Sequence, residues 1–113
     1  MRLQDTGWGV QDVEEMEVEF GDDDLDRLEI DPKETLGFAQ AVVRGYRKVM
    51  QQIRAAADER DFYEMRSLHF EKLQGARSHQ RSMRLNKQWR LIVEYVERNG
   101  RRTIRVVAIE DYH

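Results

Sequence analysis

The sequence contains no cysteine, a single proline and only three histidines. Without cysteine, neither a disulfide framework nor a thiolate metal site is possible. The histidines, His69, His79 and His113, lie far apart and have no metal-ligand spacing, so we expect no metal centre. No apolar run approaches the length of a membrane span, and the N-terminus is too acidic for a signal peptide. We therefore expect a cytoplasmic protein with neither a metal nor a membrane partner.

Motifs of the common enzyme classes are also missing. There is no zinc, Walker or dinucleotide-binding motif, and we expect no cofactor. The Gly-x-Ser-x-Gly elbow and a cysteine nucleophile are absent, which argues against acyl-transfer chemistry. No internal repeat or low-complexity segment interrupts the chain.

The 113 residues are enough for one domain with one two-layer core. Charge is unevenly divided along the chain. Residues 1–35 hold 3 basic and 13 acidic residues, a net of −10, and residues 36–113 hold 16 basic and 9 acidic residues, a net of +7. This asymmetry suggests a polyanion-binding face beside an acidic segment, although two ordinary solvated surfaces would have the same composition.

The periodicity predicts an α+β domain. Residues 1–13 have no clean period and are expected to be a poorly ordered extension, with the domain spanning residues 14–113. Met16 to Phe20 alternates like a half-buried strand, and Asp22 to Asp24 begin a short helix that ends near Pro32. A capping-box-like start predicts that a long helix begins at Pro32, with Asp31 as its N-cap. Its apolar stripe is Ala39, Val42, Val43, Tyr46, Val49, Met50, Ile53 and Ala57.

From His69 onward the period changes to two, which predicts three or four antiparallel strands with the helices on one face of the sheet. The segment 59–68 is expected to be a helical tail or a connector. Strands are expected over residues 79–85, from Trp89, and over residues 103–109, where Ile104, Val106 and Ala108 would share one side. Asn99-Gly100 is a strong hairpin signal.

A basic sheet with aromatic residues is the candidate for chemistry. Arg77, Arg81, Arg84 and Lys87 are candidate RNA-binding residues, because arginine and lysine attract phosphates. Trp89, Tyr95 and Tyr112 are able to stack on bases, although Trp89 and Tyr95 would equally suit the core. The sequence given ends in Asp111-Tyr112-His113, directly after a hydrophobic strand, and an imidazole there moves protons near neutral pH.

These segments resemble the HigB-type toxins of the RelE/ParE superfamily. The matching segments are Leu73-Gln74-Gly75-Ala76-Arg77, Ser82-Met83-Arg84-Leu85-Asn86-Lys87-Gln88-Trp89-Arg90 and the Asp-Tyr-His end. The family pattern is approximately Leu-Lys-Gly-Asp-Arg, then Ser-Ile-Arg-Val-Asn-x-x-Trp-Arg, then Asp-Tyr-His. The match is specific over residues 66–113, while residues 16–65 agree only in the order of their elements.

The resemblance implies a RelE-like microbial RNase fold and ribosome-dependent cleavage of mRNA. It also implies an antitoxin partner, here expected to be a HigA-like helix-turn-helix protein. The family's active-site residues map onto Arg90, Asp111, Tyr112 and His113. One departure concerns the His-x-x-Lys of the family, which would fall on Glu71 and Gln74.

The same His-x-x-Lys spacing occurs two residues upstream, so His69 and Lys72 are candidate replacements, or the site has lost two groups. The implied mechanism is metal-independent attack of the 2′-OH on the adjacent phosphate, giving a 2′,3′-cyclic phosphate. Arg90, with Arg84, would stabilise the phosphate charge, and His113 would act as general acid or base, with its α-carboxylate raising the imidazole pKa. Asp111 would orient or share the proton, and Tyr112 would stack on a base or donate to the phosphate. Two alternatives stay open: a ParE-like toxin that inhibits DNA gyrase, and a nuclease-inactive interaction module.

Overall fold

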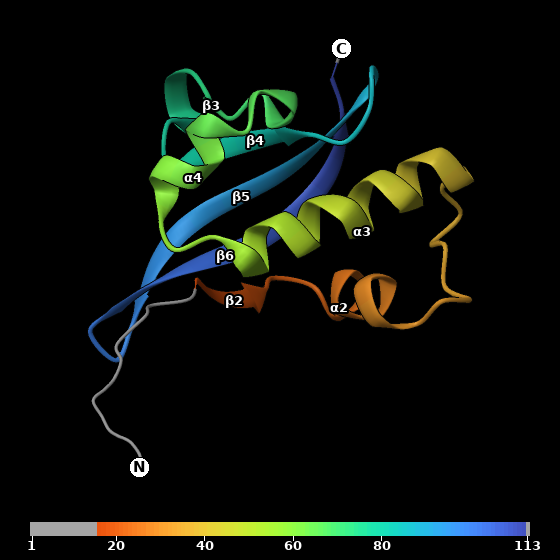
Figure 1. The fold of residues 1–113 in the computed structure, drawn as a ribbon, viewed down its shortest axis with the longest axis horizontal. Coiled ribbons are helices and arrows are strands. Elements are labelled where there is room, and N and C mark those ends of the chain that lie inside the picture. The colour runs from red at the N-terminus through yellow and green to blue at the C-terminus, as the bar shows by residue number, and fades with distance from the viewer. Residues whose placement is uncertain (1–15, 113) are drawn as a thin grey trace.

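The structure is a computed structural model and describes residues 16–112. The expected extension over residues 1–13 and the catalytic candidate His113 lie outside the described residues. In chain order, the described elements are β2 (Glu17–Phe20), α2 (Asp23–Ile30), α3 (Gln40–Ala55), α4 (Glu59–Glu64), a 3₁₀ turn (Arg66–Leu68), β3 (Glu71–Lys72), a second 3₁₀ turn (Gly75–Arg77), β4 (Gln80–Arg84), β5 (Trp89–Arg98) and β6 (Arg101–Asp111) (Figure 1).

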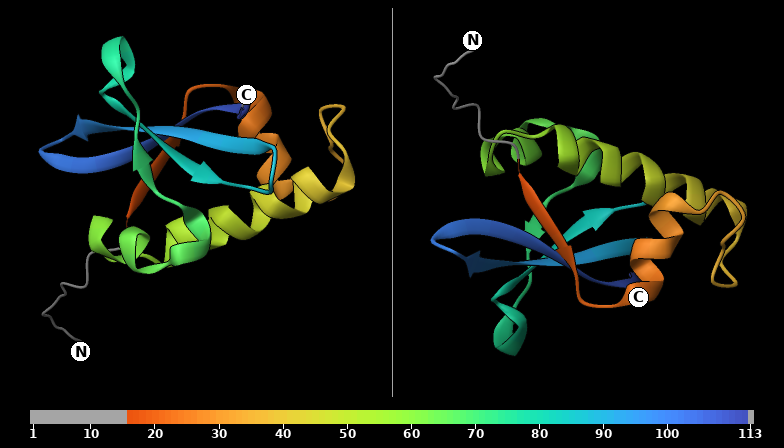
Figure 2. Two further views of the ribbon diagram at one scale, coloured as in Figure 1. Left: turned by 90° about the horizontal axis from the view of Figure 1, so that it is seen from above. Right: turned by 90° about the horizontal axis from the view of Figure 1, so that it is seen from below.

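The five strands form one sheet in the order β2-β6-β5-β4-β3. Strands β3 to β6 pair antiparallel, and β2 joins the edge of β6 in parallel. Helix α3 covers one face, and the turn Gly75–Arg77 lies on the opposite side (Figure 2). We call the face toward α3 the inner face and the opposite one the outer face. The predicted α+β class, with helices packed on one face of a sheet, is confirmed.

The core lies between α3 and the inner face. The predicted stripe is buried from Val42 to Ile53, but its two ends, Ala39 and Ala57, are exposed, and Ala56 is buried in place of Ala57. Tyr46 is fully buried, and its hydroxyl donates to the Leu25 carbonyl of α2 at 2.7 Å. Burial raises the pKa of Tyr46 well above its usual value, with further contributions from the carboxylates Glu29 and Asp26.

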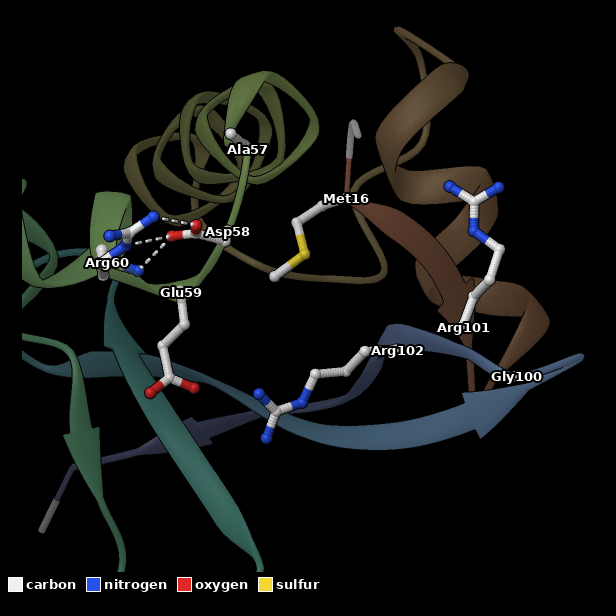
Figure 3. A pocket seen from close by; sticks show the side chains of 8 residues that line it. All are labelled: Met16, Ala57, Asp58, Glu59, Arg60, Gly100, Arg101 and Arg102. Atoms are coloured by element: carbon white, nitrogen blue, oxygen red, sulfur yellow. Dashed lines mark hydrogen bonds and ion pairs between the residues drawn. The ribbon is translucent and has the colours of Figure 1, made fainter. Parts of the chain in front are cut away.

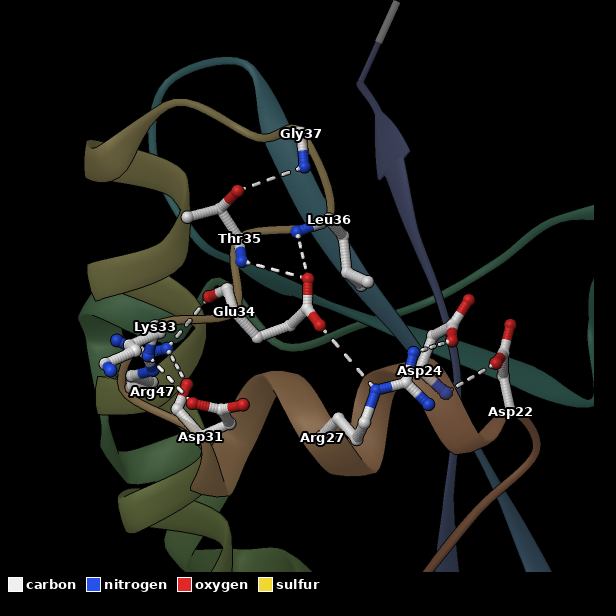
Figure 4. Close-up of polar contacts among 10 residues, drawn as sticks. All are labelled: Asp22, Asp24, Arg27, Asp31, Lys33, Glu34, Thr35, Leu36, Gly37 and Arg47. Atoms are coloured by element: carbon white, nitrogen blue, oxygen red, sulfur yellow. Dashed lines mark hydrogen bonds and ion pairs between the residues drawn. The ribbon is translucent and has the colours of Figure 1, made fainter.

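The predicted start of the long helix is wrong. Helix α3 begins at Gln40, and Pro32 to Ala39 form a loop. The Glu34 carboxylate accepts from the backbone N–H groups of Thr35 and Leu36, and Leu36 has a φ of 52° (Figure 4). Such local side-chain bonds compete with a helical turn, and a positive φ ends one.

Arg47 of α3 stabilises this loop. Its guanidinium donates to the carbonyls of Leu28, Asp31 and Glu34 at 2.8 to 3.1 Å. The loop then brings Phe38 against Trp89, edge to face with ring centroids 5.3 Å apart. The segment before α3 is therefore anchored to the first residue of β5.

A bulge in β6 changes the predicted inner set of that strand. The register passes from Ile92 opposite Ala108 to Val93 opposite Val106, so Val107 is the extra residue. As a result Ile109, and not Ala108, packs with Ile104 and Val106 against the core. The bulge also fixes which residues near the end of β6 point outward.

The remaining local predictions hold. Asp22 caps α2 by accepting from the Asp24 N–H, and β2 and the β4–β5 turn form at the expected places. Asn99 and Gly100 have φ values of 54° and 75°, as the predicted hairpin turn requires. None of the helices in residues 16–112 is long and apolar enough to span a membrane.

Candidate functional site at the end of strands β5 and β6

The register brings the end of the described chain beside the start of β5. Trp89 pairs with Asp111 and Arg90 with Glu110. Beyond β6, the Tyr112 N–H donates to the Gln88 carbonyl at 2.6 Å, and the Gln88 side-chain amide donates to Asp111 Oδ2 at 2.9 Å. Asp111 and Tyr112 are thus held against the β4–β5 turn.

Arg90 is the central cation of this site. Its side chain lies on the outer face, because its neighbours Leu91 and Trp89 point inward toward the core and Phe38. It is only 7% exposed, and its guanidinium lies 4.1 Å above the Tyr112 ring. Nη1 donates to the His69 carbonyl at 3.3 Å. Among residues 16–112, Arg90 forms no ion pair with a carboxylate, so a nearly buried positive charge has only an aromatic face and a carbonyl as partners.

Arg84 lies directly opposite Arg90 on the neighbouring strand. Its Nε donates to the Asn86 carbonyl at 3.2 Å, and its Nη1 lies 3.4 Å from His69 Nε2. Like charges opposite each other across two strands repel. The sheet nevertheless holds Arg84 and Arg90 side by side, and neither forms an ion pair with a carboxylate of residues 16–112.

His69 joins the two arginines, with its backbone on one and its ring on the other. It follows the 3₁₀ turn and has a φ of 45°, in the left-handed region that a non-glycine residue rarely adopts. Its neighbour Phe70 is buried and packs against Phe62 and Tyr63, with centroids 5.3 and 4.9 Å apart. This packing holds the strained residue in place.

The His69 ring is able to hydrogen-bond Arg84 only as an acceptor. A guanidinium has only donors, so the contact at 3.4 Å is a hydrogen bond only when Nε2 carries its lone pair. An imidazole in that form is able to accept a proton. His69 is exposed, so its ring is accessible from solvent.

Other predicted residues do not join this group. Lys72 pairs with Arg81 of β4. Side chains alternate along a strand, so Arg81 points to the face opposite that of Ser82 and Arg84, and Lys72 lies on that opposite face too. Arg81 lies 5.7 Å from the Tyr95 ring centroid, on the inner side. Lys87 is exposed in the β4–β5 turn, beside the group.

Arg77 lies on the outer face, like Arg84 and Arg90, but it is ion-paired. Its guanidinium donates to both carboxylate oxygens of Glu110, at 3.0 and 2.9 Å. Sequence reasoning did not single out Glu110 or Gln88. Glu110 adjoins the Asp-Tyr-His motif, which is a weak signal, and nothing local marks Gln88.

The opposite end of the sheet has paired charges. Glu19 of β2 accepts two hydrogen bonds from Arg98 and lies 3.7 Å from Arg105, and Glu17 lies 3.6 Å from Arg101. Two carboxylates of the acidic N-terminal part therefore offset part of the positive charge of the β5–β6 hairpin. Arg84 and Arg90, toward the other end of the sheet, form no ion pair with a carboxylate of residues 16–112.

A cavity of about 520 Å³ also lies at this hairpin end, away from Arg90. Glu59 and Arg102 point into it from α4 and β6 (Figure 3). Arg102 also stacks 4.2 Å from the Tyr95 ring centroid, and burial raises the pKa of Tyr95 well above its usual value, with Glu59 adding to it. Within residues 16–112, no three histidine, aspartate or glutamate side chains gather as a metal-binding group.

The sequence of residues 18–112 matches the family model of the RelE-like toxin of the type II toxin–antitoxin system HigB. The chain belongs to the HigB-like toxin family. Its antitoxin partner follows from that membership. No curated protein has a significantly similar sequence.

A solved structure, the YoeB/ParE toxin from Agrobacterium tumefaciens, has a similar fold to this HigB-like toxin. The TM-score is 0.52 at 12% identity, over 87% of this chain and 100% of that one. At that identity the likeness concerns the fold, which is of the RelE/YoeB type.

Proposed function

We propose that this HigB-like toxin is a metal-independent endoribonuclease that cleaves mRNA on the ribosome. Members of the RelE-like family are generally endoribonucleases. One observation supports the proposal most strongly. Arg84 and Arg90 lie opposite each other on the outer face, in contact with His69 and Tyr112, and neither forms an ion pair with a carboxylate of residues 16–112. Two unpaired guanidinium groups suit the phosphate of an RNA backbone.

In the proposed step, the ribose 2′-oxygen attacks the adjacent phosphorus. The O2′–P bond forms, the P–O5′ bond breaks, and the products are a 2′,3′-cyclic phosphate and a 5′-hydroxyl. Arg90 and Arg84 stabilise the charge that develops on the phosphate oxygens. His69 Nε2 takes the 2′-OH proton, which its lone pair toward Arg84 permits once substrate displaces that contact.

The leaving 5′-oxygen needs a proton, and we assign its donation to His113, two residues after Asp111 in the sequence. Tyr112 has one ring face over Arg90, which suits either stacking with a base or donation to the phosphate. Lys72 lies on the other face of the sheet, so in this mechanism His69 alone replaces the family His-x-x-Lys pair. The expected cellular location is the cytoplasm, and the expected antitoxin is HigA-like.

In vitro translation with primer-extension mapping of the mRNA tests this proposal. Wild-type protein is expected to give ribosome-dependent cuts, and Arg90→Met is expected to abolish them. Arg98→Met is the matched control, because Arg98 is an outer-face arginine of the same strand, paired with Glu19. Growth inhibition without mRNA cleavage, together with loss of gyrase activity, would overturn the proposal in favour of a ParE-like action.

A further inference from the structure

The bond between Arg77 and Glu110 joins the turn Gly75–Arg77 to β6 across the outer face. All three guanidinium nitrogens of Arg77 donate: Nη1 and Nη2 to the two Glu110 oxygens, and Nε to Gln80 Oε1 at 2.9 Å. Gln80 in turn donates to Glu94 at 3.3 Å. A planar fork on a carboxylate is a geometrically specific ion pair, and it occupies both oxygens.

Glu110 is the carboxylate that the sheet register places opposite Arg90. Side chains of directly paired residues on antiparallel strands point to the same face and lie about 4.5–5.5 Å apart at Cβ. A glutamate beside a nearly buried arginine is normally its ion-pair partner. Here the two make no ion pair, and Arg90 lies over Tyr112 instead.

The position of the Glu110 carboxylate determines what Arg90 is able to bind. A carboxylate paired with Arg90 would neutralise its charge and occupy the donors that a phosphate needs. It would also draw the guanidinium away from Tyr112. The Arg77 fork opposes this because it fixes the orientation of the Glu110 carboxylate and already supplies one donor to each of its oxygens.

We propose that Arg77 is a positioning residue that holds Glu110 away from Arg90 and so keeps Arg90 available for the substrate phosphate. This inference rests on the proposed nuclease function. It gives Arg77 an effect through Glu110 in place of the direct RNA contact expected from the sequence. The two roles differ in one respect: only the positioning role depends on the charge of Glu110.

The test compares Arg77→Met, Glu110→Gln and the double variant in the in vitro translation assay. Arg77→Met is expected to lower the cleavage rate by about 10- to 100-fold, less than the about 100- to 1,000-fold that losing a transition-state donor costs. Glu110→Gln alone is expected to stay near wild type. The double variant should recover to the level of Glu110→Gln, because a neutral amide does not neutralise Arg90.

A double variant as slow as Arg77→Met would overturn the inference, since a direct RNA contact or a purely structural role of Arg77 is not rescued by Glu110→Gln. Circular dichroism and thermal unfolding of all variants detect a structural defect. An Arg77→Met protein with full activity would also overturn it.

Two further measurements separate this inference from the proposed function. Binding of a fluorescein-labelled 2′-O-methyl RNA, followed by anisotropy, should show the same loss and rescue without any cleavage. If wild-type protein neither cleaves nor binds RNA, the nuclease proposal fails, and arginine side-chain NMR decides the inference. Pairing of Arg90 with Glu110 in Arg77→Met, absent from wild type, supports it, and unchanged Arg90 signals overturn it.

Discussion

Replacing Arg90 by methionine should separate stability from activity. The side chain is nearly buried, and its charge has the Tyr112 ring and one carbonyl as partners among the described residues. Methionine keeps most of the volume of the aliphatic stem and removes the charge.

The effects of this substitution on stability have opposite signs. The variant loses a cation–π contact of about 0.5–2 kcal/mol and a hydrogen bond of about 0.5–1.5 kcal/mol. It gains relief from the repulsion with Arg84, the like charge directly opposite on β4. It also no longer buries a charged group, which by itself costs several kcal/mol. We expect an unfolding free energy within about 1 kcal/mol of wild type, or higher.

Activity should change far more. Loss of a positioned charge donor lowers the rate by about 100- to 1,000-fold. Urea unfolding followed by circular dichroism gives the stability, and induced growth inhibition with primer-extension mapping gives the activity. Arg90→Lys is the intermediate control, because it retains the charge without the fork. A variant destabilised by more than about 3 kcal/mol would show that Arg90 is structural, and the reasoning from an unpaired charge would be refuted.

Three further predictions follow from the same contacts. His69→Gly should raise the unfolding free energy by up to about 1 kcal/mol, because glycine adopts a φ of 45° without strain. The same variant should lose growth inhibition, and retained toxicity would exclude the His69 ring as the general base. Gly45→Ala should destabilise by about 1–3 kcal/mol in urea, because a Cβ would lie 2.5 Å from the Leu85 carbonyl oxygen, and it should also lower activity through the adjoining Arg84; full stability would mean that α3 moves away freely. Finally, the pKa values of Tyr46 and Tyr95 are raised in the folded protein, so both hydroxyls favour the folded state only while they are protonated. Their contribution to the unfolding free energy is complete below the unfolded tyrosine pKa of about 10 and is lost as pH rises above that value. Tyr46→Phe should therefore flatten the alkaline decrease measured by urea unfolding, at a neutral-pH loss of about 1–3 kcal/mol for the unsatisfied Leu25 carbonyl, and an unchanged slope would contradict the buried position of the hydroxyl.

Local signals in the sequence were sufficient where the structure itself is local. The Asp22 cap, the Asn99-Gly100 turn and the stripe of α3 each depend on neighbours within a few residues. The helix start failed because the same local chemistry had two solutions: Glu34 bonds the next two backbone N–H groups in a loop instead of forming a capping box. Arg47, which stabilises the loop from α3, is too distant for a motif to show.

The site was predicted through residue types and not through geometry. The family resemblance pointed to Arg90 and Tyr112, and the structure places them in contact. Spacing alone did not show that His69 joins the site and Lys72 does not. The expectation for both residues assumed a continuous strand, and the left-handed backbone at His69 interrupts the alternation of its side chains. The pairing of Arg77 with Glu110 spans 33 residues and depends on the β6 register, which the bulge at Val107 sets.

The parallel pairing of β2 with β6 has a consequence for the order in which the candidate site assembles during synthesis. The strand made first among those described has the last one as its neighbour, and β6 also completes the pairing of β5 and supplies Tyr112. A chain that stops before Arg101 therefore has neither a closed sheet edge nor the aromatic partner of Arg90. Such long-range pairings form late, since loop closure must precede them. A nascent chain thus forms the Arg90–Tyr112 contact only after residue 112 has left the ribosome, and the nuclease chemistry proposed above would begin only then.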